Sequence, residues 1–311
     1  MKTGILFLIL LLAGFPSRAQ PRPYRRLVLI SDPHLPGRNK AMKEKALADI
    51  NSWDDVDGVA VLGDLCADLG TAQEYAAAKT YLSRFRKPVY PIGGNHDYAY
   101  SLSTGNKDLA NPVERAAALE RLKTATGLPE VRYTLKLGRY RLLFASIDDL
   151  HYGEITALST GTLAWMTRTL DADKDSPAVI FFHAPLEGTL QTKNSVSGQP
   201  RFEAQPRAEV RALLRAHRQV FLWASGHTHT APTNEHFRDP ANLYDGRVYD
   251  VYVPDLDGRS FLKAADPEPT THDGAWSVSL YFYPDKVVVK TYDHRAKRWL
   301  NDLTREVRPT L

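Results

Sequence analysis

Five short blocks along the chain carry side chains that can bind metal ions. They are Asp32-Pro33-His34, Gly63-Asp64, Gly94-Asn95-His96-Asp97, His183 and Gly226-His227-Thr228-His229. Carboxylates, amide oxygens and imidazoles are ligands that suit Zn, Fe, Mn or Ni. One tetrahedral ion cannot use so many ligands, whereas two ions about 3.5–4 Å apart that share a carboxylate can use them. The residue types therefore predict a dinuclear metal site.

Each block follows a short apolar run that is typical of a strand buried on both faces. The runs cover residues 27–31, 58–62, 89–92, 178–182 and 220–224. Ligands of open α/β sheets lie outside the carboxyl ends of the strands. The five predicted strand ends can therefore converge on one crevice.

The remaining patterns supply the elements that hold these strands. Helices are predicted at 39–53, 72–85, 111–126, 161–170 and 206–217, and a hairpin at 131–137 and 140–147. Further strands are predicted at 247–253, 277–283 and 286–292, so the C-terminal part is β-rich. Strand–helix alternation followed by a β-rich part predicts a layered α/β sandwich. Because no linker is long enough to divide the chain, we expect one domain over residues 20–311.

The five blocks in this order resemble the signature of the calcineurin-like metallophosphoesterases. That signature is D-x-H, G-D, G-N-H-D/E, a histidine after an apolar strand, and G-H-x-H, and the resemblance runs from about Leu27 to His229. It implies a four-layer α/β/β/α sandwich with two mixed β-sheets and a metal site at the C-terminal ends of the strands. In this reading, the β-rich tail belongs to the second sheet.

The resemblance also implies a role for each block residue. Asp32, His34 and His229 would bind the first metal, Asn95, His183 and His227 the second, and Asp64 both. Two divalent or trivalent ions, of Mn, Fe or Zn, are expected. The implied reaction is hydrolysis of a small-molecule phosphodiester by in-line attack of a metal-bridging hydroxide, with His96 as the general acid.

Two points about these blocks remain to be assigned: the residue that orients His96, and the turn that lets His227 and His229 bind adjacent ions. The family often has a second aspartate in G-D-x-x-D that orients the catalytic histidine, but here that position is Ala67, so Asp97 is the expected substitute. His227 and His229 alternate in an extended segment, which directs their side chains to opposite sides. Binding two adjacent ions therefore needs a local turn, which we expect Gly226 to supply.

Candidate substrate contacts lie next to the blocks. Tyr98 and Tyr100 follow the histidine block directly and are expected to stack on a base or alcohol group of the substrate, with simple packing as the alternative. The polar segment 187–205 after His183 is either a substrate-facing loop or a surface excursion.

Other functions stay open at this point. A broad-specificity phosphomonoesterase would use the same residues. A catalytically silent protein that binds metal or a phospho-ligand is the alternative from another class, and the presence of His96 argues against it. A nucleic-acid-binding module is disfavoured, because a net charge of +4 without a concentrated basic or aromatic face gives little attraction for phosphate backbones.

The N-terminus has the pattern of a secretory signal peptide. Lys2 precedes an apolar run over residues 5–14, and Ser17-Arg18-Ala19 has the small residues of a cleavage site. The run is too short to cross a bilayer as a helix, and no later segment is apolar enough to do so. We therefore expect cleavage near Ala19 and a secreted or periplasmic protein. The single cysteine, Cys66, excludes an intramolecular disulfide framework, and a buried thiol is expected.

Overall fold

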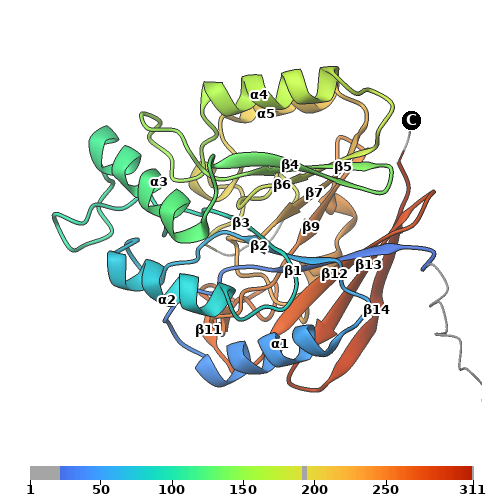
Figure 1. Ribbon diagram of the computed structural model, residues 1–311, viewed down its shortest axis with the longest axis horizontal. Coiled ribbons are helices and arrows are strands. Elements are labelled where there is room, and N and C mark those ends of the chain that lie inside the picture. The colour runs from blue at the N-terminus through green and yellow to red at the C-terminus, as the bar shows by residue number, and fades with distance from the viewer. Residues whose placement is uncertain (1–21, 191–194, 310–311) are drawn as a thin grey trace, which may run out of the picture.

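The computed structural model describes residues 22–190 and 195–309 (Figure 1). The predicted signal peptide over residues 1–19 lies outside the described residues. Among the described helices, none is long and apolar enough to cross a membrane.

The first sheet has six strands in the order β14-β13-β12-β1-β2-β3. Their bounds are β1 Arg25–Ile30, β2 Gly58–Leu62, β3 Val89–Ile92, β12 Trp276–Phe282, β13 Val287–Asp293 and β14 Arg298–Val307. The three N-terminal strands run parallel to one another, and β12 joins them antiparallel to β1. The sheet is therefore mixed.

The second sheet also has six strands, in the order β4-β5-β6-β7-β9-β8. Their bounds are β4 Arg132–Leu137, β5 Tyr140–Ala145, β6 Ala178–Phe181, β7 Val220–Ser225, β8 Leu243–Tyr244 and β9 Val248–Tyr252. The strands β5, β6, β7 and β9 are parallel, and the two edge strands are antiparallel to their neighbours. A small hairpin of β10 (Arg259–Ser260) and β11 (Thr270–Thr271) stands apart from both sheets.

Helices cover the outer faces of the two sheets (Figure 1). Their bounds are α1 Lys40–Ser52, α2 Ala72–Leu82, α3 Pro112–Thr126, α4 Thr160–Asp171 and α5 Arg207–Ala216. Short 3₁₀ turns occur at Pro200–Phe202, Glu235–Arg238 and Pro240–Asn242. The helices α1 and α2 lie against the first sheet, and α4 and α5 lie against the second (Figure 1).

The alternation of side chains along each strand builds three apolar layers. On β1, Leu27 and Leu29 belong to the core between the two sheets, together with Phe181 of β6. Val28 and Ile30 point the other way and pack with residues of α1 and α2. A strand with both faces buried needs apolar residues at every position, which explains the continuous apolar runs.

The predicted four-layer α/β/β/α sandwich with two mixed sheets is confirmed. The expected place of the tail is wrong, because β12, β13 and β14 extend the first sheet and only β8 and β9 lie in the second. The free edge of β1 takes β12 as an antiparallel partner, with Leu27 opposite Leu280. The sequence alone did not predict β14, because its side chains, mostly exposed or half-buried, show no regular apolar alternation.

Candidate metal centre

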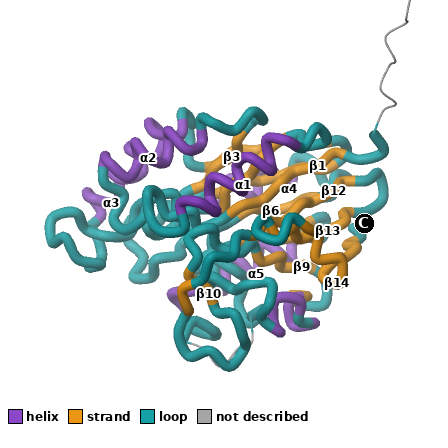
Figure 2. Tube along the Cα trace, turned by 90° about the horizontal axis from the view of Figure 1, so that it is seen from below, coloured by secondary structure: helices purple, strands orange, loops and turns teal. Residues whose placement is uncertain are grey.

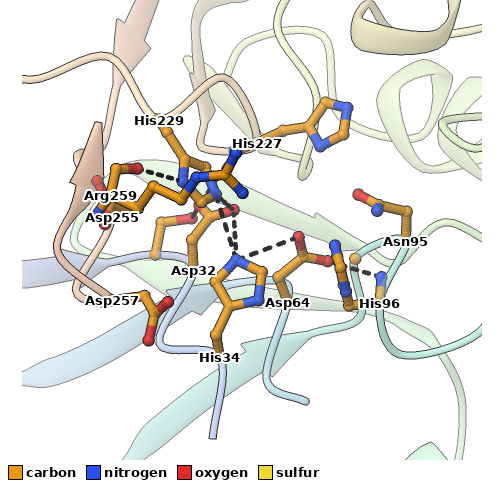
Figure 3. Close-up of polar contacts among 12 residues, drawn as sticks. Asp32, His34, Asp64, Asn95, His96, His227, His229, Asp255, Asp257 and Arg259 are labelled. Carbon is orange, nitrogen blue, oxygen red and sulfur yellow. Dashed lines mark hydrogen bonds and ion pairs between the residues drawn. The ribbon is translucent and has the colours of Figure 1, made fainter. Parts of the chain in front are cut away.

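The ends of strands from both sheets bring the predicted ligands together (Figure 3). Asp32 follows β1, Asp64 follows β2 and Asn95 follows β3, all in the first sheet. His183 follows β6, and the block with His227 and His229 follows β7, in the second sheet. The site therefore lies across the seam between the two sheets.

The ligand atoms form two groups that share one carboxylate. The first group is Asp32, His34, Asp64 and His229, and the second is Asp64, His183 and His227, with the ligand atoms of each group within 4.8 Å of one another. The Asn95 Oδ1 atom lies 3.1 Å from His183 Nε2 and so joins the second group. Asp64 is the member common to both groups, as a bridging carboxylate requires.

Backbone carbonyls fix the ring orientation of three of the histidines. The Nδ1 atoms of His34, His183 and His229 lie 3.3, 2.7 and 2.7 Å from carbonyl oxygens. Those carbonyls belong to Ala67, Leu62 and Arg259 respectively. Because a carbonyl can only accept, Nδ1 carries the proton and the Nε2 lone pair points into the site.

The fourth histidine uses the opposite ring nitrogen. His227 Nε2 lies 3.2 Å from the carbonyl oxygen of Arg201, which leaves Nδ1 as its ligand atom. The Nδ2 atom of Asn95 donates to the Tyr100 hydroxyl at 3.1 Å, which turns Oδ1 toward His183. Each candidate ligand is thus oriented by a neighbour that itself need not touch a metal.

The site has polar atoms that only a cation can satisfy together. Asp32 Oδ1 is buried and accepts no hydrogen bond, although His229 Nε2 lies 3.3 Å away. The Nε2 atoms of His34 and His229 face each other at 3.2 Å, with both Nδ1 atoms committed to carbonyls. Buried lone pairs that converge in this way repel one another unless a positive charge lies between them. The donor set therefore fits a divalent metal ion.

Protons compete with metal ions for the ring nitrogens of two candidate ligands, His229 and His183. Burial opposes a charge on His229, but the negative charges of Asp32, 3.3 Å from its Nε2 atom, and of Asp255 outweigh burial and raise its pKa to about 10. Burial is likewise overcome at His183, where the charges of Asp64 and Asp32 raise the pKa to about 9. Metal binding must therefore displace protons from these rings.

The backbone of the site is strained where the ligands sit. Asp32, His34, Asp64, His227 and His229 all have positive φ angles, between 41° and 63°. They make up five of the eight non-glycine residues with positive φ in the described chain. Such conformations cost about 1 kcal/mol or more each and persist where the surrounding structure enforces them. This clustering marks the site as a functional one.

The turn that separates His227 from His229 is made by the histidines themselves. Both have left-handed φ angles, 63° and 48°, whereas Gly226 does not have a positive φ. The expectation that Gly226 supplies the turn is therefore wrong. Glycine is needed because a Cβ there would overlap Ser31 Oγ and Asp32 Oδ2. The absence of a side chain at Gly226 therefore lets the end of β7 approach the end of β1 closely.

Comparison with known proteins agrees with this geometry. The model of the calcineurin-like phosphoesterase family matches residues 25–231, which is more than half of the chain. The chain belongs to the calcineurin-like phosphoesterase family. The match covers every candidate ligand and ends before β10 and β11.

Individual relatives share less than 30% of their residues with this chain. It is 29% identical over 177 residues to the glycerophosphodiester phosphodiesterase GpdQ of Enterobacter lignolyticus, which covers 51% of this chain and 56% of that protein. The aligned region thus spans about half the length of this relative. A dimetal phosphatase from Danio rerio has a TM-score of 0.59 at 13% identity, covering 93% and 100% of the two chains. GAP50, the anchor in the inner membrane complex of Plasmodium, has a TM-score of 0.62 at 11% identity, covering 93% and 90%.

In this chain, Asp97 does not orient His96. Its buried carboxylate accepts hydrogen bonds from the backbone nitrogens of Gly94, Cys66 and Leu65 at 2.8, 2.9 and 3.1 Å. Burial and the charge of Asp64 raise its pKa to about 7. Asp97 therefore ties the loop after β2 to the loop after β3, and its predicted catalytic role is wrong. Cys66 is buried in the same loop, as expected.

His96 is oriented by a backbone group instead. Its Nδ1 atom lies 2.9 Å from the carbonyl oxygen of Asp68, and its backbone nitrogen donates to Asp64 Oδ1 at 2.9 Å. The ring packs edge-on against His34, with ring centres 4.8 Å apart. Burial lowers the pKa of His96, and the charge of Lys107 acts in the same direction. His96 thus lies beside the metal ligands without belonging to either ligand group.

The two tyrosines that follow His96 have different places. Tyr98 is 1% exposed, donates its hydroxyl to the carbonyl of Asp149, and does not line the site cavity. The predicted substrate contact of Tyr98 is therefore wrong, and it is a packing residue. Tyr100 lines the cavity and also holds Asn95 in place.

The site opens into a cavity of about 350 Å³, whose lining includes residues that the motifs did not identify. Arg201 and Phe202 come from the segment 187–205, so its described part forms a wall of the cavity, and contact with a substrate stays a prediction. Arg259 comes from β10 and belongs to no block. No signal in the sequence marks Arg259, because its place depends on how β10 folds back onto His229.

Proposed function

We propose that this phosphoesterase is an exported dinuclear-metal hydrolase that cleaves phosphodiester bonds. The observation that carries the proposal is the pair of ligand groups with Asp64 in common. Two ions would be held by the same residues that the sequence blocks supply. Asp32, His34 and His229 would hold the first, Asn95, His183 and His227 the second, and Asp64 both.

The metals would supply Lewis-acid stabilisation of the phosphoryl group and a nucleophile from water near neutral pH. The protein's contribution is positioning. Carbonyl groups fix the ring tautomers, and the strained backbone at Asp32, Asp64 and His227 holds the ligands before substrate arrives. Positions fixed in advance need no reorganisation during the reaction.

His96 has the position of a general acid. Its Nδ1 atom faces the Asp68 carbonyl and its ring lines the cavity, so Nε2 is the nitrogen available to the substrate. A proton on Nε2 can pass to the departing alkoxide, which a diester with an alkyl leaving group requires. A protein that only binds phospho-ligands has no need of this proton.

The preference for diesters is supported by the relative with a stated activity. GpdQ of Enterobacter lignolyticus is a glycerophosphodiester phosphodiesterase, and its alignment covers 51% of this chain. Export is supported by the N-terminal pattern around Ala19. N-terminal sequencing of the protein from the periplasm or medium tests it, and an intact Met1 there would contradict cleavage.

Hydrolysis of two chromogenic substrates tests the reaction. The purified protein is stripped with a chelator, reloaded with Mn²⁺ and assayed with bis(p-nitrophenyl) phosphate and p-nitrophenyl phosphate. We expect metal-dependent turnover of the diester and loss of it in Asp64→Asn, whereas Asp245→Asn, at a partly exposed carboxylate outside the cavity, keeps it. Turnover of the monoester alone would refute the diesterase proposal, and the absence of metal-stimulated turnover would refute the enzyme.

A further inference from the structure

The cavity beside the metal centre carries more positive charge than the described acids around it neutralise. Besides the metal ligands, the acidic lining residues are Asp68, Asp257 and Glu268. Asp68 pairs with Lys107 at 3.7 Å, and Asp257 pairs with Lys43 at 2.9 Å. The lining also contains Arg38, Arg201 and Arg259, so three guanidinium groups face the one remaining acid, Glu268.

Two of these arginines, Arg38 and Arg259, both lie at the β10–β11 hairpin although they are 221 positions apart in sequence. A nitrogen of the Arg38 guanidinium donates to Thr271 Oγ1 at 3.4 Å. Thr271 of β11 lies directly opposite Arg259 of β10 in the hairpin. Opposed residues of an antiparallel pair project to the same face, so both guanidinium groups gather on one side of this hairpin. Like charges on one face of a hairpin repel each other, and an anion that binds both removes this repulsion.

The hairpin holds Arg259 rigidly against the metal centre. Asp255 accepts hydrogen bonds from the backbone nitrogens of Gly258 and Arg259 at 2.8 and 3.1 Å. The Arg259 carbonyl accepts from His229 at 2.7 Å, while its side chain extends past His229 toward His227 (Figure 3). In Figure 2, β10 lies in a loop-rich part of the molecule at the lower edge of the view. The Arg259 carbonyl thus orients the metal ligand His229, and the Arg259 guanidinium group remains available to bind another group.

A diester places one negative charge at the reacting phosphorus, and two metal ions suffice to neutralise it. The guanidinium pair therefore fits an additional anion of the substrate, since guanidinium groups bind phosphate oxygens in a bidentate fashion. We infer that Arg259 and Arg38 bind a second phosphate of the substrate, so that the preferred substrate is a phosphodiester carrying a further phosphate group. This inference rests on the proposed function and specifies its substrate class.

A pair of substrates that differ by that phosphate alone tests the inference. Thymidine 5′-(p-nitrophenyl phosphate) carries one anionic group, and its 3′-phosphate derivative carries two, with the same leaving group. For the metal-loaded protein we expect kcat/KM to be about tenfold higher for the 3′-phosphate, in the range of a charge-assisted hydrogen bond. The advantage resides in KM and decreases as KCl is raised from about 0.05 to 0.5 M, because salt screens exposed charges.

Variants at the hairpin separate this role from a structural one. Arg259→Gln and Arg38→Gln should bring the ratio of the two kcat/KM values close to one, and Arg259→Lys should retain part of it. The ratio does not depend on the fraction of folded protein. The matched control is Arg215→Gln, which removes a charge that pairs with Asp245 outside the cavity and should leave the ratio unchanged.

Two results would overturn the inference. One is a ratio near one for the unaltered protein. The other is an equal loss for both substrates in Arg259→Gln, which would place this side chain on the reacting phosphate. If bis(p-nitrophenyl) phosphate and both nucleotide esters all resist metal-dependent hydrolysis, the proposed function itself fails.

Discussion

Replacing Gly226 with alanine should damage one metal position more than the other. An added Cβ would overlap Ser31 Oγ and Asp32 Oδ2, and it would lie 2.8 Å from Ser31 Cβ. Ordinary van der Waals contact begins at 3.4 Å, so Ser31 Cβ must recede by about 0.6 Å and the two oxygen atoms by more. The Asp32 carboxylate also accepts from the His227 backbone nitrogen at 3.0 Å, so moving it breaks that bond.

The size of the effect follows from this displacement. Overpacking of a closed site costs about 1–3 kcal/mol of stability. A misplacement near 1 Å at a reacting centre lowers turnover by about 10²-fold. Asp32 belongs to the first ligand group only, whereas Asp64, His183 and Asn95 keep their contacts. We therefore expect bound metal to fall from about two ions to about one per chain.

The assay combines elemental analysis after gel filtration with turnover of bis(p-nitrophenyl) phosphate. Gly153→Ala is the matched control, because a Cβ there meets nothing within 4 Å. That variant should keep both the metal content and the turnover of the unaltered protein. A Gly226→Ala protein with two metals and full turnover would refute the close-approach argument.

Three further perturbations have defined outcomes. Gly94→Ala would place a Cβ 2.5 Å from the Asp64 nitrogen and 2.8 Å from His183 Cε1, so it should remove both metals; retention of one would contradict the shared role of Asp64. His96→Ala should slow hydrolysis of diesters with alkyl leaving groups by about 10²–10⁴-fold at constant metal content. It should slow p-nitrophenolate release far less, and equal slowing of both would argue against a general acid. Burial raises the pKa of Asp250 to about 7 despite hydrogen bonds from Leu186, Ser225 and Thr189. The folded state therefore keeps a proton that the unfolded state loses, and stability should fall by about 4 kcal/mol as pH rises from about 4 to 7. Urea unfolding of Asp250→Asn should lack this part of the pH dependence, and an unchanged pH profile would show that Asp250 is already ionised.

Much of the fold follows from local patterns. The helix α3 is an example, since Asn111 caps it through Val113 and Glu114, and Gly127 ends it with a φ of 71°. Strands such as β2 and β6 were predicted because apolar residues or glycine occupy every position. The pairing of β12 with β1 was not predictable in this way. The two strands are far apart in sequence, and their pairing depends on how the whole core packs.

The sequence by itself determined which residue types face the site and in what order. Carboxylate, amide and imidazole groups after buried strands predict metal ligation wherever the strand ends meet. Only the tertiary structure decided the roles of the neighbours. Asp97 bonds to backbone nitrogens and Tyr98 is buried, because each lies on the inward face of its loop.

Tertiary packing also places the functional residues that no motif marks. Arg259 reaches the centre because a hairpin outside the family match folds back so that its carbonyl meets His229. Gly226 is required by the approach of another strand end, and not by its own conformation. Distances between segments are set by packing across the two sheets, which a linear pattern does not encode. The sequence therefore determines the chemistry of the ligands, and the tertiary structure determines what lies beside them.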